Sequence, residues 1–345
     1  MRLLIPSARL RRLPQHLRLA HEYCFFLHDE MVRMLLEYER ADASKVSVQF
    51  VDPEQSRRFE KLARKHHAIT ALRELGLHEE ARRVVLNAIT SALVSDCGHH
   101  IYEALMCFEK RKIVPGFNLL RKPLLDDLMY CSWIVGDEDG FYSAFTSGDP
   151  NKITLKLIGN HRREILAAAI EKTELVGVVT ADALISILFD AASAEGLYGL
   201  FQHAVHLVTV SRIELKTTPE NFNFIFKNPN DDDVYETLYG LLPTVLLYLV
   251  HLVVVLYDRV KPPDPGARRA FVFRSTNGYQ YLHHELGPTK LAEAFAKALT
   301  PHFACDACKT PLKVTTYNAA RLLFSDSFRC TKCGRKQPFP FSWIL

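Results

Sequence analysis

Four of the eight cysteines form two closely spaced pairs near the C-terminus, and this spacing constrains the fold more than any other feature of the chain. Cys305 and Cys308 stand in CDAC, Cys330 and Cys333 stand in CTKC, and the 21 residues 309–329 separate the two pairs. A CxxC turn brings two thiolates to one metal ion, and two such turns are typical of a zinc ribbon. The sequence therefore predicts one structural Zn²⁺ per chain, bound by these four cysteines.

Four thiolates fill the tetrahedral coordination sphere of Zn²⁺ and leave no open position for a substrate. We therefore expect this zinc to fold a small β-rich module at 301–345 and to perform no reaction. The segments KVTTYN and SFRC, which lie between the cysteine pairs, have the β-branched and aromatic content of short strands. Two alternatives are four free cysteines that fall in pairs by chance, and a redox-active CxxC, which is less favoured without a thioredoxin-like context.

Basic residues are concentrated around the predicted zinc site, although the formal net charge of the whole chain is only +4. A local cluster of this kind is a candidate surface for binding RNA or DNA through phosphate groups. Its members are Lys309, Lys313, Arg321, Arg329, Lys332, Arg335 and Lys336. The alternative is a solvated basic face without a ligand.

The rest of the sequence predicts a mostly α protein with a large helical bundle. From Leu17 to about Arg40, apolar residues recur at three- and four-residue spacing, which is typical of an amphipathic helix. A turn is expected at Pro115 and Gly116, and a bend or restart at Pro123. Further helices are predicted at 54–75, 78–95, 99–112, 115–137, 152–172, 180–193, 195–215 and 232–260, and the segment TTPENFNFIFKNPNDDD between the last two predicts a loop that carries a short strand.

The run from Leu241 to Tyr257 is apolar on all sides and would span about 25 Å as a helix. This length is marginal for a membrane span, and the run contains Pro243 and His251. A buried central helix is therefore the favoured interpretation, and no membrane partner is expected. The N-terminal segment lacks the apolar run and cleavage site of a secretory signal, so we expect a cytoplasmic protein.

A break in composition at VKPPDPGARR predicts the end of the helical domain, which would cover 1–262. A connector at 263–300 follows. Within it, AFVFRSTNGYQYL alternates apolar and polar residues around Asn277 and Gly278, which predicts a β-hairpin. The segment PTKLAEAFAKALT then predicts a helix that leads into the zinc ribbon.

Two segments, HHIYEALMCFEKRKIVPGFNLLRKPLLDDLMYCSWIVGDED and EGLYGLFQHAVHLVT, resemble an uncharacterised bacterial family distantly related to the HEPN domains. The similarity covers about 97–260. In this comparison Arg121 and His206 match the prominent arginine and histidine of that family. The acidic residue expected after LLRKPLL is shifted here to Asp126 and Asp127.

This resemblance implies two functions. Many HEPN proteins are metal-independent ribonucleases of toxin–antitoxin and phage-defence systems, so Arg121 and His206 become candidate catalytic residues of an endoribonuclease toxin. In that role His206 acts as general base on a ribose hydroxyl and Arg121 stabilises the developing charge. The alternative for both residues is a structural role in the bundle.

The resemblance also implies a bundle that engages a protein partner or an antitoxin. We take as the leading hypothesis a bacterial intracellular protein that binds nucleic acid or protein, in phage defence. A non-catalytic dimeric scaffold is the third hypothesis, and we expect a homo-oligomer. No Walker loop, GxGxxG, HExxH or nucleophile elbow is present in the sequence, which disfavours the familiar classes of hydrolase and dehydrogenase.

Overall fold

The computed structural model describes residues 3–42, 45–193, 195–208, 217, 232–283, 287–339 and 341. These residues form a mostly α protein with a small C-terminal β element, as predicted. The first helices are α1 (Ser7–Leu10), α2 (Arg18–Arg40), α3 (Pro53–Lys65), α4 (Ala68–Glu74), α5 (His78–Glu109), α6 (Ile113–Lys122), α7 (Leu128–Gly136) and α8 (Glu138–Thr146). They are followed by α9 (Leu155–Ile158), α10 (Arg162–Ile170), α11 (Ala181–Leu188), α12 (Leu197–Val205), α13 (Asp233–Asp258), α14 (Pro265–His283), α15 (Gly287–Leu299) and α16 (Thr316–Ser325).

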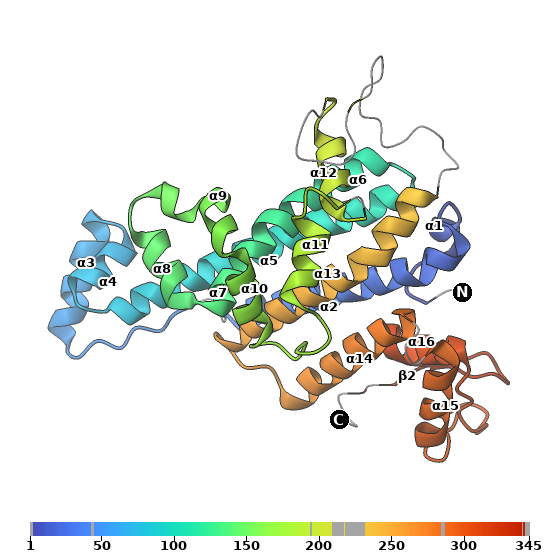
Figure 1. The fold of residues 1–345 in the computed structure, drawn as a ribbon. Coiled ribbons are helices and arrows are strands. Elements are labelled where there is room, and N and C mark those ends of the chain that lie inside the picture. Colours follow the sequence, from blue (N-terminus) through green and yellow to red (C-terminus); the bar gives the residue numbers. More distant parts are fainter. Residues whose placement is uncertain are drawn as a thin grey trace.

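Three long helices, α2, α5 and α13, form the centre of the bundle (Figure 1). Helix α13 is apolar on all sides, and every residue from Leu242 to Tyr257 is buried. Within the described part of the chain, α13 alone is long and apolar enough to cross a membrane by length and composition, and 83% of its apolar window lies inside the protein. This burial agrees with the prediction of a central core helix.

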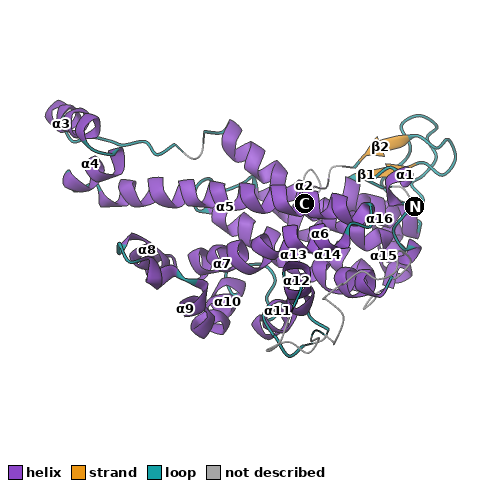
Figure 2. Cartoon of the chain, turned by 90° about the horizontal axis from the view of Figure 1, so that it is seen from above, coloured by secondary structure: helices purple, strands orange, loops and turns teal. Residues whose placement is uncertain are grey.

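Helices α3 and α4 project at one end of the molecule, and the C-terminal strands lie at the other end (Figure 2). The predicted helix 54–75 is divided into α3 and α4, because the backbone is extended at His66 and His67. The predicted helices 78–95 and 99–112 are instead one helix, α5, because Gly98 lies inside it and faces Met31 of α2. The predicted helix 152–172 is divided into α9 and α10, and α11 and α12 are shorter than the predicted helices 180–193 and 195–215. The predicted loop TTPENFNFIFKNPNDDD lies outside the described residues, apart from 217, 232 and 233.

The turn predicted at Pro115 and Gly116 is wrong by a few residues. The chain turns at Lys110–Lys112, where Arg111 has a φ of 58°, and both predicted turn residues lie in the first turn of α6. Proline is tolerated there because the first N–H groups of a helix have no partner within it. At Pro123 the predicted irregularity is present as a π-helical turn, η2 (Pro123–Asp127).

The β-hairpin predicted around Asn277 and Gly278 is wrong, because α14 continues through both residues. Asn277 donates from its side chain to the Phe273 carbonyl oxygen within the helix, at 2.8 Å. Gly278 faces Tyr23 of α2 and Phe324 of α16, and a Cβ placed on it would lie 2.8 Å from each ring. The glycine therefore serves a close helix crossing rather than a turn, and sequence alone does not distinguish these uses.

Gly278→Ala is expected to destabilise the protein by about 1–2 kcal/mol, because overpacking at this crossing outweighs the better helix propensity of alanine. Urea denaturation measures the change. Gly240→Ala is the matched control: Gly240 also lies in a helix, and among the described residues no atom outside its own stretch of helix lies within 4 Å of a Cβ built on it. Its replacement should be neutral or stabilising by up to about 1 kcal/mol. Equal effects of the two substitutions would contradict the proposed crossing.

Two short strands, β1 (Ser327–Arg329) and β2 (Lys336–Pro338), pair antiparallel with Phe328 opposite Gln337. SFRC thus contains a strand, as predicted. The strand predicted in KVTTYN is wrong, because Thr315 accepts from the N–H of Asn318 and caps α16, whose first residues are Thr316 and Tyr317. The capping bond favours the helix over an extended conformation.

The core of the C-terminal part is continuous with the core of the bundle. The ring of Phe324 of α16 stacks on the ring of Phe26 of α2, with 5.8 Å between the ring centroids, and its centroid lies 5.3 Å from that of Tyr23. Arg274 of α14 donates to the Leu323 carbonyl oxygen and lies 3.1 Å from the carboxylate of Glu30. The cysteine-bearing segments are therefore anchored to α2 and α14. The domain boundary near 262 stays a prediction.

Candidate metal centre

The two CxxC segments adopt the same backbone conformation. In the first, the N–H of Lys309 donates to the Cys305 carbonyl oxygen at 2.8 Å; in the second, the N–H of Gly334 donates to the Cys330 carbonyl oxygen at 3.0 Å. Lys309 and Gly334 both have positive φ, 54° and 74°. Each turn is thus closed by the fourth residue after its first cysteine, in a conformation that glycine adopts easily and lysine rarely.

A second hydrogen bond repeats in both turns. The N–H of Cys305 donates to the Thr310 carbonyl oxygen at 2.8 Å, and the N–H of Cys330 donates to the Arg335 carbonyl oxygen at 2.9 Å. Both turns therefore hold their first cysteine between the same two backbone bonds. This repetition indicates a built pair of metal-binding turns rather than four cysteines paired by chance.

The four sulfurs converge within 4.8 Å of one another. Cys305 and Cys333 are 3.6 Å apart at Sγ, and so are Cys308 and Cys330. Tetrahedral Zn²⁺ at about 2.3 Å from each sulfur places the sulfurs about 3.8 Å apart. The cluster therefore has the dimensions of a Cys₄ metal site, with two ligands contributed by each turn.

Local hydrogen bonds favour thiolates at part of this cluster. The Thr310 hydroxyl lies 3.2 Å from the sulfur of Cys308 and lowers the pKa of that thiol to about 6. At Cys333 the N–H of Arg335 lowers the pKa, but desolvation and the three neighbouring sulfurs outweigh it and raise the pKa to about 11. Four sulfurs this close cannot all ionise without a cation, because thiolates repel one another, and metal ligation requires the thiolate form.

Asn318 joins the two halves of the site, and sequence reasoning did not identify it. Its side chain is buried on α16, donates to the carbonyl oxygens of Lys313 and Arg329 at 2.9 and 3.1 Å, and accepts from the N–H of Arg329 at 3.0 Å. Lys313 follows the first cysteine pair and Arg329 precedes the second. The sequence signal that could have identified Asn318 is Thr315, a helix-capping residue three positions before it.

The predicted basic surface is largely exposed. Six of its residues have exposed side chains: Lys309, Lys313, Arg329, Lys332, Arg335 and Lys336. Arg321 differs, because it is 5% exposed and its guanidinium lies over the ring of Tyr317 at 5.6 Å. Arg321 is therefore part of the interior of the module, and only the other six residues are accessible to a ligand.

The candidate catalytic residues lie on neighbouring helices. Arg121 is half-buried in the last turn of α6, and His206 is exposed at the C-terminal end of α12, which packs against α6. The hydrogen bonds and ion pairs among described residues include none between the two side chains. An assembled catalytic pair thus remains a hypothesis.

Comparisons with known proteins give no match: no family model, no curated protein and no solved structure matches the chain. The HEPN-like relationship therefore stays a prediction from the sequence segments quoted above, and the function must be argued from the site itself.

Proposed function

We propose that this protein binds RNA or DNA through the C-terminal module, which a structural Zn²⁺ holds together. The observation that supports this proposal is the location of six exposed basic side chains on and beside the two metal-binding turns and β2. Because four sulfurs this close need a cation to be held together as thiolates, we expect the positions of these basic side chains to depend on the metal. Arginine and lysine at fixed positions suit phosphate oxygens.

The helical bundle acts as the support for this surface and as the second interaction element. Its continuous core with α16 holds the zinc module in one orientation. We retain an intracellular role in phage defence, with a protein partner or antitoxin on the bundle, as the wider hypothesis, and its support is the sequence resemblance alone. The endoribonuclease alternative with Arg121 and His206 has weaker support, because no described contact joins the two side chains.

Nucleic-acid binding is expected to depend steeply on salt, because binding releases counterions from the phosphates. With four to six phosphate contacts, a plot of log affinity against log salt for single-stranded RNA should have a slope of about −3 to −4. Replacing Lys332 and Lys336 together with glutamine should flatten the slope by about 1.4 and weaken binding. Fluorescence anisotropy with a labelled oligonucleotide measures both quantities.

A matched control is available on α3, at the other end of the molecule. Lys61 and Lys65 are also exposed, so their joint replacement with glutamine removes the same charge from a different surface. The control variant should retain the original slope. A slope near zero for the unmodified protein, or an equal loss in both variants, would refute the proposed surface.

A further inference from the structure

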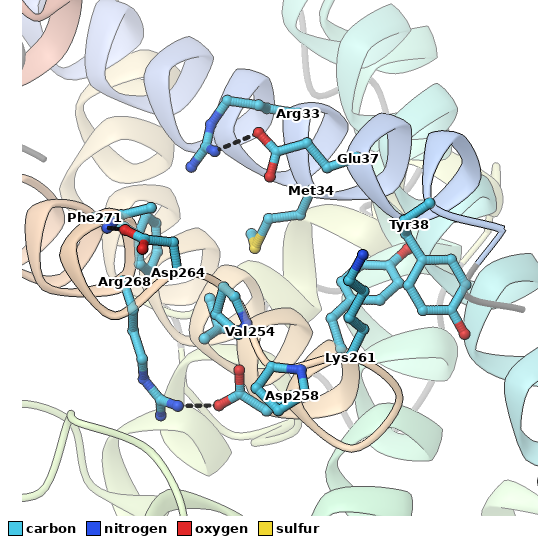
Figure 3. A pocket seen from close by; sticks show the side chains of 15 residues that line it. Arg33, Met34, Glu37, Tyr38, Val254, Asp258, Lys261, Asp264, Arg268 and Phe271 are labelled. Atoms are coloured by element: carbon cyan, nitrogen blue, oxygen red, sulfur yellow. Dashed lines mark hydrogen bonds and ion pairs between the residues drawn. The ribbon is translucent and has the colours of Figure 1, made fainter.

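A cavity of about 380 Å³ lies between the C-terminal half of α2, the end of α13 and the start of α14. Its apolar and aromatic wall includes Met34, Tyr38, Val254, Tyr257 and Phe271 (Figure 3). Helix α13 ends at Asp258, and Pro262 and Pro263 of the connector to α14 also line the cavity. The volume lies within the range of small-molecule sites in proteins, about 300–1,000 Å³.

Three buried polar atoms in this wall have no hydrogen-bond partner within the described parts of the chain: the hydroxyl oxygens of Tyr38 and Tyr257, and Oδ1 of Asp258. The tyrosines are only 5% and 6% exposed, and their ring centroids are 4.4 Å apart. Buried polar groups in native proteins are nearly always paired with protein, water or ligand. Three unpaired atoms around one cavity therefore point to a ligand that carries hydrogen-bonding groups.

The charges of the cavity are arranged in two ion pairs. Arg33 lies 2.8 Å from the carboxylate of Glu37, and Arg268 forms an ion pair with Asp258 through Oδ2. Figure 3 shows Met34 and Val254 between these two pairs. Arg33 and Arg268 also contact Glu30 and Glu174, at 2.7 and 2.5 Å, so both guanidinium groups are neutralised by the protein.

Asp264 also lines the cavity, and its Oδ2 accepts from the N–H of Ala267 at the start of α14. Two further charged groups are left for a ligand. Oδ1 of Asp258 is a buried acceptor to which no described residue donates, and burial raises the pKa of this carboxyl group. Lys261 is an exposed cation that lines the same cavity, and none of the ion pairs in the described ranges includes it. The cavity thus offers an anionic acceptor, a cation and an apolar wall, and an anion or an alkane alone would use only part of it.

We propose that this cavity binds a small zwitterion with an apolar side chain, of the size of a hydrophobic amino acid. The ammonium group of the ligand donates to Oδ1 of Asp258, and its carboxylate accepts from Lys261. The apolar side chain packs on Val254 and Phe271, and the two tyrosine hydroxyls supply or accept the remaining hydrogen bonds. This site is independent of the nucleic-acid surface and of the zinc.

Three matched probes test the proposal: L-phenylalanine, phenethylamine, which lacks the carboxylate, and 3-phenylpropionate, which lacks the ammonium group. Saturation-transfer NMR with the full-length zinc-loaded protein detects weak binding. L-phenylalanine should bind with a Kd of about 1 mM or tighter, and each single-charge analogue should bind at least about tenfold more weakly. Asp258→Asn should weaken L-phenylalanine binding at least about tenfold, and Lys261→Gln at least about threefold.

Asp182→Asn, on the exposed surface of α11, is the control and should leave binding unchanged. Lys261 is exposed, so Lys261→Gln should keep the original melting temperature and remains informative if Asp258→Asn fails to fold. Absence of binding by all three probes at millimolar concentration overturns the proposal and assigns the cavity to ordered water. Equal binding of the three probes, or L-phenylalanine binding that survives Lys261→Gln unchanged in a folded protein, also overturns it.

Discussion

Cys330→Ser is expected to abolish zinc binding and to unfold the segment that carries the cysteines. Cys330 is buried, supplies one of the four sulfurs, and its backbone closes the second metal-binding turn. Apparent zinc-binding free energies in small Cys and His modules are about 10–16 kcal/mol, and binding is coupled to folding. Because α16 is also held by the bundle core, we expect the variant to lose less stability than this full binding energy, but still more than about 5 kcal/mol.

Two measurements check this expectation. Elemental analysis of protein purified without chelator should return one zinc per chain for the unmodified protein and a value near zero for the variant. Circular dichroism and limited proteolysis should then locate the unfolding in the C-terminal segment. Cys107→Ser is the control, because Cys107 is a half-buried free cysteine on α5 far from the cluster in sequence, and it should retain the zinc. A metal content near zero in the unmodified protein would remove the zinc site.

Glu109→Ala is expected to destabilise the bundle by about 3–5 kcal/mol, because it removes one partner of a buried ionic network. Arg9 donates to both carboxylate oxygens of Glu109, at 2.7 and 2.6 Å, and His21 lies 3.1 Å away through Nε2. The other ring nitrogen of His21 lies 2.5 Å from the hydroxyl of Tyr239. The network thus joins the N-terminal segment, α2, α5 and α13.

The charge states of this network explain the size of the effect. Burial lowers the pKa of His21, which favours the neutral ring as donor to Glu109. At Glu109 burial raises the pKa, but hydrogen bonds from His21 and Arg9 outweigh it and lower the pKa overall. The carboxylate therefore stays ionised, and its removal leaves a buried N–H and a guanidinium without their acceptor.

Urea denaturation at neutral pH measures the loss of stability through the transition midpoint. Glu103→Ala is the matched control, since Glu103 lies on the same helix with an exposed side chain, and it should change the unfolding free energy by less than about 0.5 kcal/mol. A loss below about 1 kcal/mol for Glu109→Ala would show that the network contributes little to stability.

Local sequence patterns predicted those parts of the molecule that local physics controls. The apolar spacing from Leu17 to Arg40 predicted α2 nearly to its ends, because that period is typical of a helix that packs on a core. The burial of every residue from Ala20 to His28 goes beyond the single stripe that the spacing implies. The uniform apolarity of 241–257 predicted burial on all sides. The two CxxC pairs predicted the ligand set, since two thiolates three residues apart already converge within one turn.

The tertiary structure decided the elements for which local signals allow two outcomes. Asn277–Gly278 is a turn signal in isolation, yet here the glycine lies in α14 because Tyr23 and Phe324, which are distant in sequence, occupy the space of a side chain. The segment after the first cysteine pair has strand-like composition, but the Thr315 cap and the packing of Phe324 on α2 make it a helix.

The same distinction holds for the sites. The sequence by itself determined that four cysteines come together in one cluster with the dimensions of a metal site, because the spacing within each pair is short and the chemistry is carried by the side chains. The chain fold alone brought Asn318 between the two turns and placed Tyr38 beside Tyr257 and Asp258, which lie more than 200 positions later in the sequence. Contacts over such separations depend on how helices pack, and helix packing is determined by the whole core rather than by any one segment.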